Sequence, residues 1–277
     1  QEIVAATNFK QRVRKMMEAA TRSFPEKAVH LFAIGAVYDK HLDDRVTAID
    51  FYEQAMDLDP QNVEAAQPLI EVYWEDKRWE RAEPLLDLTL AKLGPQMELR
   101  DQQHLHYRLG FVTEKLHKEE KALTHYRHAY ELDSTHLPTL QGMGELLFHR
   151  EDWDRAFKIF QTMLVHHRES LAPEAIVEIF NRQGIIKLKV GERRKALDFF
   201  RKALDLEPNH KSTLERMVAL HEAQGDWDDV VHYRRQLVSQ LDDGQAKFQG
   251  LVAIADVLHG QMRNARMAIE AYEQALE

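Results

Sequence analysis

Cysteine is absent from this sequence of 277 residues, so disulfide bonds, thiolate metal sites and cysteine nucleophiles are all excluded. Glycine and proline are also scarce, with 11 and 8 residues, against roughly 12% for the two together in average proteins. No apolar run approaches the roughly 18 residues that a membrane-spanning helix requires. A formal net charge of −9 argues against a nucleic-acid backbone as the main partner. The scarcity of helix breakers in a charged chain favours an all-helical protein.

Internal repetition governs the organisation of the chain. A similar six-residue segment of small, acidic and apolar residues recurs at Ala55–Pro60, Ala129–Ser134 and Ala203–Pro208, and the three segments start 74 residues apart. Three tryptophans keep the same step of 74 residues: Trp79, Trp153 and Trp227. A shorter step of 35 residues separates the prolines Pro25, Pro60 and Pro95, and again Pro138, Pro173 and Pro208. Several independent residue types in one register indicate a repeat array whose larger unit is a pair of shorter repeats.

Each short repeat carries the pattern of two helices. Between residues 180 and 187 the inward positions follow the i, i+3, i+4, i+7 spacing of a helix, and Gly191 then breaks the chain. The small residues Gly184 and Ala196 allow two antiparallel helices to approach closely, and Phe200 fills the space beyond them. The tryptophans stand at the start of second helices, where a structural role through burial of the ring is expected.

At these residues the chain resembles the tetratricopeptide repeat (TPR) family, whose unit is a helix–turn–helix of about 34 residues with this order of small, aromatic, alanine and proline positions. The resemblance covers nearly the whole chain. It implies an all-α, right-handed superhelical solenoid of antiparallel helix pairs, continuous over residues 1–277. The expected repeats lie near residues 28–62, 63–96, 103–136, 137–170, 177–210, 211–244 and 248–277. Extra residues near 97–102 and 171–176 predict longer first helices in the third and fifth repeats.

The two ends of the sequence show incomplete repeats. Residues 1–27 are expected to be the second helix of a preceding repeat, with inward positions at Val13, Met17, Ala20 and Pro25. The last residues form an amphipathic stretch without a polar cap. Because a solenoid repeat buries its apolar face only against its neighbours, we expect the chain to be a fragment of a longer array. Such uncapped ends predict that copies of the chain can associate with one another.

No catalytic constellation is found in the sequence. His221 and Glu222 match the first two residues of the zinc-protease motif HExxH, but Gly225 occupies the position of the second histidine. Of the 15 histidines, His125 and His128 have the i, i+3 spacing that can hold a metal with further ligands. Their place on the outer side of a second helix favours solvated surface side chains instead. The sequence therefore predicts a protein that is not an enzyme and that has no cofactor and no metal.

In the resembled family the first helices line a concave groove, and the resemblance implies that this groove binds a protein or peptide segment. The lining combines acidic residues, a column of arginines and a group of aromatic side chains. The residues expected to contact a partner are Glu71, Trp74, Tyr107, Arg108, Phe111, Glu145, Phe148, Arg182 and Arg216. Aromatic anchors in an acidic lining predict a partner segment that is basic or apolar. The alternative is a solvated face on which arginine and glutamate only neutralise each other.

The resulting functional hypothesis is a protein-interaction scaffold, with no role in nucleic-acid binding or membrane insertion. A second hypothesis makes the chain the substrate-recruiting arm of a larger enzyme whose catalytic domain is absent here. An RNA-binding helical repeat is a third alternative, because pentatricopeptide repeats have a similar period. The net charge of −9 opposes that third alternative.

Overall fold

The computed structural model describes residues 8–16 and 24–276, and every regular element in these two ranges is helical. The chain divides into two compact units, residues 1–146 and 147–277. The first unit contains a helix over residues 8–16. It continues with α2 (Phe24–His41), α3 (Arg45–Leu58), α4 (Val63–Glu75), α5 (Trp79–Leu93), the short 3₁₀ helix η1 (Gly94–Gln96), α6 (Leu99–Lys115) and α7 (Glu119–Leu132).

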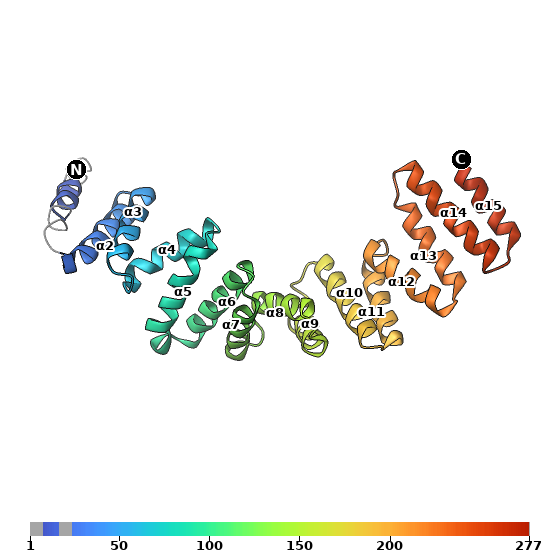
Figure 1. The fold of residues 1–277 in the computed structure, drawn as a ribbon, viewed down its shortest axis with the longest axis horizontal. Coiled ribbons are helices and arrows are strands. Elements are labelled where there is room, and N and C mark those ends of the chain that lie inside the picture. The colour runs from blue at the N-terminus through green and yellow to red at the C-terminus, as the bar shows by residue number, and fades with distance from the viewer. Residues whose placement is uncertain (1–7, 17–23, 277) are drawn as a thin grey trace. The chain divides into compact units, whose positions relative to one another are not determined.

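Helix α8 (Leu137–His149) begins in the first unit and ends in the second. The second unit continues with α9 (Trp153–His167), α10 (Pro173–Lys189), α11 (Arg193–Leu206), α12 (Lys211–Gln224), α13 (Trp227–Ser239), α14 (Gly244–Gly260) and α15 (Ala265–Leu276). Helices fold back on their predecessors in pairs such as α2–α3, α6–α7, α10–α11 and α14–α15 (Figure 1), and these pairs pack along one another. The predicted all-α fold of antiparallel helix pairs is confirmed. Within the described ranges, no helix combines the length and apolar character needed to cross a membrane.

A glycine facing an aromatic ring sets the close approach within a helix pair. A Cβ atom at Gly110 in α6 would lie only 2.6 Å from Cδ1 of Tyr126 in α7, and one at Gly184 in α10 would clash with the ring of Phe200 in α11. Tyr126 and Phe200 are fully buried. Tyr126 also donates a hydrogen bond of 2.6 Å to the Glu114 carboxylate, and burial together with that bond raises the pKa of its hydroxyl. The close helix packing expected at Gly184 is thereby confirmed.

In the helix pairs from α4–α5 to α12–α13, the turn contains one residue in the left-handed backbone region. The φ angles of these residues are 57° at Lys77, 57° at His117, 60° at Glu151, 83° at Gly191 and 78° at Gly225. The step of 74 residues joins Lys77 to Glu151 and Gly225, and His117 to Gly191. The next backbone N–H then closes the helix end, as where Lys118 donates to the Thr113 carbonyl over 2.8 Å. One turn geometry is thus reused with and without glycine.

Helix lengths alternate along the chain. Helices α6 and α10 have 17 residues each, against 13 in α4 and α8, as the extra residues before the third and fifth repeats predict. Pro68 and Pro84 lie inside α4 and α5. Val13 is buried, whereas Met17, Ala20 and the side chain of Pro25 lie outside the described residues. The seven repeat ranges, and one continuous array over residues 1–277, stay predictions.

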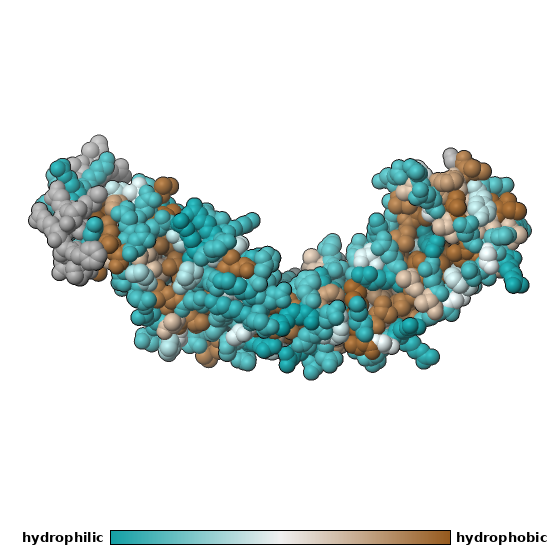
Figure 2. Space-filling model, viewed as in Figure 1, coloured by the Kyte–Doolittle hydropathy of each residue, from teal (hydrophilic) through white to brown (hydrophobic). Residues whose placement is uncertain are grey.

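Apolar surface is exposed over α14 and α15 (Figure 2). The large apolar side chains that these two helices expose are Phe248, Ile269, Tyr272 and Leu276. Other apolar residues of the two helices, including Ile254 and Ala268, are buried in one cluster with Val230 and Val238 of α13. Self-association of the chain stays a prediction.

Candidate protein-binding surface

Five of the predicted partner-binding residues gather on the first helices α4 and α6. We call this group the Trp74 surface; it comprises Glu71, Trp74, Tyr107, Arg108 and Phe111. The spacings of three and four residues place each set on one face of its own helix. Both helices pack against the same apolar cluster, which contains Leu69, Leu86 and Leu109. This shared cluster holds the two faces side by side.

Arg108 is the centre of the Trp74 surface. Its Nη1 atom lies 2.5 Å from Oε1 of Glu71, and Nη2 lies 3.4 Å from Oε2 of the same carboxylate. The guanidinium carbon sits 4.6 Å from the centroid of the Trp74 ring. The Arg108 side chain is only 11% exposed, whereas that of Glu71 is 59% exposed. A bidentate, charge-assisted pair with a cation–π contact therefore fixes Arg108 and neutralises it.

Aromatic rings form the apolar part of the Trp74 surface. The ring centroid of Phe111 lies 5.1 Å from that of Trp74 and 6.3 Å from that of Tyr107. Trp79 meets Trp74 and Phe111 edge-on, at 5.5 and 5.6 Å. The structural role expected for Trp79 is confirmed, because it supports the rings in front of it. Trp74, Tyr107 and Phe111 remain half-buried and present ring surface to solvent.

A cavity of about 500 Å³ opens beside Arg108. Its apolar lining includes the buried residues Ile70, Leu86 and Leu105, and its polar lining includes Glu71 and the exposed Asp101. This combination of an apolar wall with few carboxylates suits an aliphatic side chain that carries a positive charge at its tip.

In the second unit, Phe148 and Arg182 lie together. The guanidinium carbon of Arg182 is 4.9 Å from the centroid of the Phe148 ring, and its Nη2 atom is 3.6 Å from the Glu178 carboxylate. The Phe148 ring rests edge-on against Trp153 at 5.5 Å. An arginine over an aromatic ring, beside a glutamate, thus occurs in both units. Of the remaining predicted residues, Glu145 is half-buried on α8 and Arg216 is half-buried on α12.

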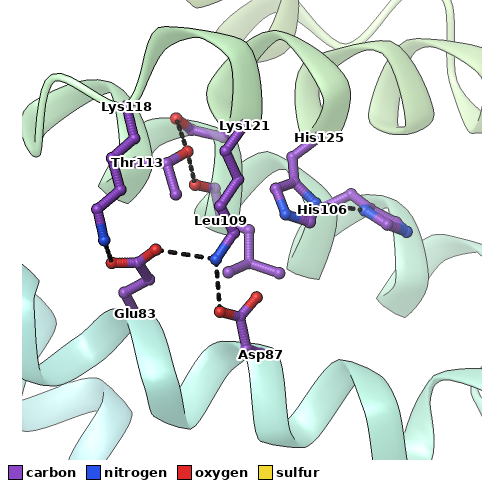
Figure 3. A network of polar contacts seen from close by, with 9 residues as sticks. Glu83, Asp87, His106, Leu109, Thr113, Lys118, Lys121 and His125 are labelled. Carbon is purple, nitrogen blue, oxygen red and sulfur yellow. Dashed lines mark hydrogen bonds and ion pairs between the residues drawn. The ribbon is translucent and has the colours of Figure 1, made fainter.

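A polar network on the second helices joins α5 to α7 (Figure 3). Glu83 is buried and accepts from Lys118 at 2.5 Å and from Lys121 at 2.8 Å; Lys121 also donates to Asp87 at 2.6 Å. Burial alone would raise the pKa of Glu83, but the hydrogen bonds from the two lysines outweigh it and lower that pKa below its ordinary value of 4.5. The spacing of single helices does not reveal this network, because its members come from two repeats.

The histidines of α6 and α7 depart from the sequence-based expectation. His128 is exposed, as predicted, but His125 is half-buried and its Nδ1 atom lies 3.1 Å from Nδ1 of His106. Burial, reinforced by the charges of His125 and His128, lowers the pKa of His106 to about 4. Burial also lowers the pKa of His125. The spacing along one helix did not reveal the contact of His106 with His125, because the two histidines lie on different helices of the pair.

A second histidine group lies at the turn between α12 and α13. Nδ1 of the buried His221 is 3.4 Å from Oδ2 of Asp226 and 3.4 Å from Oδ2 of Asp229. Among the described residues, this is the trio of histidine and carboxylate side chains whose ligand atoms all lie within 4.8 Å of one another. Asp226 directly precedes α13, so the positive end of the helix dipole disfavours a cation there. A hydrogen bond between His221 and Asp226, with the Asp229 carboxylate close by, accounts for the group.

Antiparallel helix pairs, repeated at a fixed step, define a helical repeat protein. Residues 42–96 and 177–210 match family models described as tetratricopeptide repeat. Each of the two compact units therefore contains a segment of tetratricopeptide repeat sequence.

Individual relatives are distant. Superkiller protein 3 of Schizosaccharomyces pombe is 21% identical over 209 residues, which are 75% of this chain and 15% of that protein. The chain thus spans a small part of the length of this curated relative. The crystal structure of YrrB, described as a TPR protein with an unusual peptide-binding site, is 22% identical over 73% of this chain and 96% of its own, with a TM-score of 0.52. A structure of MamA AMB-1 is 19% identical over 66% of this chain and 92% of its own, with a TM-score of 0.50. Likeness at this level of identity shows the fold.

Proposed function

We propose that the chain binds an extended, basic or apolar segment of a protein partner on the first helices of its repeats, with the Trp74 surface as the principal contact. TPR proteins are generally interaction scaffolds without catalytic activity, which sets the class of function. The observation that carries the proposal is the group of half-buried rings at Trp74, Tyr107 and Phe111 beside a cavity. Aromatic side chains held in this way are the residue type that dominates binding energy at protein interfaces.

The rigidity of the Trp74 surface supports this role. Trp79 holds Trp74 and Phe111 from behind, and Arg108 lies against the Trp74 ring. Side chains already ordered in the free protein lose little conformational entropy on binding, so more of the contact energy appears as affinity. Arg108 acts here as a positioning residue, because its charge is already paired with Glu71.

Charge sets the expected chemistry of the partner. Glu71 and Asp101 stand exposed at the cavity beside the rings, and the net charge of the chain is −9. A lysine or arginine of the partner would lay its aliphatic stem on the apolar wall and its charge against the Asp101 carboxylate, because the Glu71 carboxylate is already paired with Arg108. Phe148, Arg182 and Arg216 of the second unit, and Glu145 near the end of the first unit, are proposed as further partner contacts. The peptide-binding site named for YrrB is a precedent in the same fold.

Peptide selection followed by affinity measurement tests the proposal. A displayed library of random peptides is selected on the full chain, and the strongest peptide is titrated by fluorescence anisotropy. Trp74→Ala should weaken its affinity at least about tenfold, as expected for an interface anchor. Phe248→Ala is the matched control, because it removes an exposed aromatic ring on α14 and should leave the affinity unchanged. Equal affinity for wild type and Trp74→Ala would contradict the proposal.

The hypothesis of a substrate-recruiting arm stays a prediction. It shares the same first step, capture of a protein segment, and differs only in the fate of the captured protein. The tenfold loss expected for Trp74→Ala applies to both hypotheses.

A further inference from the structure

Three histidines of one helix pair gather at a single place: His106 on α6, and His125 and His128 on α7. Nδ1 of His106 lies 3.1 Å from Nδ1 of His125 (Figure 3), and the ring centroids of His106 and His128 are 5.0 Å apart. His106 and His125 are half-buried, whereas the side chain of His128 is 52% exposed. The rings of His125 and His128 therefore both lie beside that of His106, at 5.4 and 5.0 Å between centroids, although the nitrogens of all three are not within 4.8 Å of one another.

The positions equivalent to His106 and His125 carry aromatic residues in two other helix pairs. Seventy-four residues later stand Phe180, Phe199 and Lys202. The two phenylalanine rings there lie 6.5 Å apart, with Nζ of Lys202 at 5.9 and 5.0 Å from them. Seventy-four residues earlier, Phe32 and Phe51 share an apolar cluster. Aromatic packing is the ordinary use of these positions, so their joint replacement by histidines calls for a different role.

The geometry of the histidine pair suits metal coordination. Zinc–nitrogen bonds of about 2.0–2.1 Å at a tetrahedral angle place two ligand nitrogens about 3.3–3.4 Å apart. The observed separation of 3.1 Å between His106 and His125 needs to open only slightly to reach that value. Nδ1 of His128 now lies 3.4 Å from the Glu131 carboxylate. Because both of these side chains are exposed, the His128 ring can turn toward the pair at little cost.

Neighbouring charges do not oppose a cation. The charged groups that act on His125 include Lys121, Asp87 and Glu83. Lys121 is held by both carboxylates, at 2.8 Å from Glu83 and 2.6 Å from Asp87. With Lys118 added, the group holds two positive and two negative charges. Its net charge is therefore zero beside the histidines.

We propose that His106, His125 and His128 bind one divalent transition-metal ion of the zinc type. Nδ1 of His106 and Nδ1 of His125 are two of the ligands, and His128 supplies the third nitrogen. The proton now shared between the two Nδ1 atoms moves to Nε2 of its own ring, so both rings stay neutral. Three protein ligands leave the fourth tetrahedral position to water. Nitrogen ligands favour Zn²⁺, Ni²⁺ or Cu²⁺ over Mg²⁺, which prefers oxygen.

The bound ion would join α6 to α7 in addition to their apolar packing. An ion that binds the folded chain and not the unfolded chain raises the free energy of unfolding. Zinc should therefore raise the thermal midpoint of unfolding of the protein. The effect depends on residues outside the Trp74 surface, so it is independent of the function proposed above.

Isothermal titration calorimetry of the full chain with ZnCl₂ tests the site, with MgCl₂ titrated in parallel. We expect one zinc ion per chain and no binding of magnesium. The double variant His106→Phe with His125→Phe reproduces the phenylalanines of the equivalent positions, so it should keep its helicity by circular dichroism while losing the zinc ion. His128→Gln changes an exposed ligand and should weaken zinc binding at least about tenfold. His166→Gln changes an exposed histidine on α9 and should bind as wild type does.

Three results would overturn the proposal. The first is a wild-type chain that binds no zinc, and the second is a folded double variant that still binds one zinc ion. The third concerns the group at His221. If Asp226→Asn with Asp229→Asn loses the zinc ion while the double phenylalanine variant keeps it, the site lies at the α12–α13 turn and not between α6 and α7.

Discussion

Single residues in the turns of the helix pairs differ in conformational energy although their geometry is the same. Glycine occupies the left-handed position at Gly191 and Gly225, where it meets no steric penalty. Lys77, His117 and Glu151 adopt the same backbone region with a side chain attached, which costs about 1 kcal/mol each. Their side chains are exposed. The hydrogen bonds that close the helix are made by the backbone and need only the left-handed φ angle. The turn can therefore carry a side chain at this position despite the strain.

Replacement of Glu151 by glycine should stabilise the protein. The change removes the left-handed penalty, and we expect the free energy of unfolding to rise by up to about 1 kcal/mol, measured by urea denaturation with circular dichroism. The reciprocal change Gly191→Ala introduces the penalty and should lower the free energy of unfolding by a similar amount. Effects of the same sign in the two variants would show that side-chain contacts, and not backbone strain, decide the outcome.

At the scale of elements, the helices of neighbouring repeats are joined by ion pairs as well as by apolar packing. Glu83 on α5 connects to Lys118 and Lys121 around the start of α7. Glu83 is buried. Its replacement removes the carboxylate that both lysines share. Glu83→Gln should lower the free energy of unfolding at pH 7 by about 1–3 kcal/mol. Glu270→Gln, which breaks an exposed pair with Arg266 on α15, is the matched control and should change it by less than about 0.5 kcal/mol.

The same carboxylate makes stability depend on pH. The pKa of Glu83 in the folded chain lies below its ordinary value of 4.5, so the unfolded chain binds more protons than the folded chain in the interval between the two values. Its contribution to stability is fully present above pH 4.5 and is lost as the pH falls through the folded pKa. Denaturation midpoints measured at falling pH should therefore drop more steeply for wild type than for Glu83→Gln. Parallel pH profiles would contradict this assignment.

The sequence predicts the elements well because their causes are local and periodic. The 74-residue register locates the helix pairs, and the pairing of Gly184 with Phe200 follows from the need for one small and one large residue at a crossing. The sequence predicts that Glu71, Trp74 and Arg108 lie on first helices, and they do lie on α4 and α6; their role in binding stays a prediction. The bidentate contact between Arg108 and Glu71 is not foreseen, because it depends on the distance between two helices 37 residues apart in sequence. The contact of His106 with His125 is missed for the same reason.

At the scale of the whole molecule, stability is expected to be distributed along the array. In repeat proteins each repeat contacts only its neighbours, so the loss of a terminal repeat leaves distant repeats intact. The cluster that holds α14 and α15 includes Val230 and Val238 of α13. The described members of this cluster lie between Val218 and Ala271.

Deletion of residues 244–277 should therefore leave most of the chain folded. Removal of α14 and α15 uncovers Val238, which destabilises α13, while the helices of the first unit keep their packing. We expect the helical circular dichroism to fall in proportion to the helices removed, with the most stable part of the thermal transition unchanged. Collapse of all helical signal would mean that the array folds as one cooperative body.

The exposed turn residues also make the protein convenient to label. The sequence has no cysteine, and Lys77 and Glu151 already hold the left-handed conformation with a full side chain. A cysteine at each of these two positions would carry one fluorophore in each compact unit, without competition from native thiols. The pair would act as a spectroscopic ruler, so that the distance between the units could be followed by energy transfer while a peptide or a zinc ion is added.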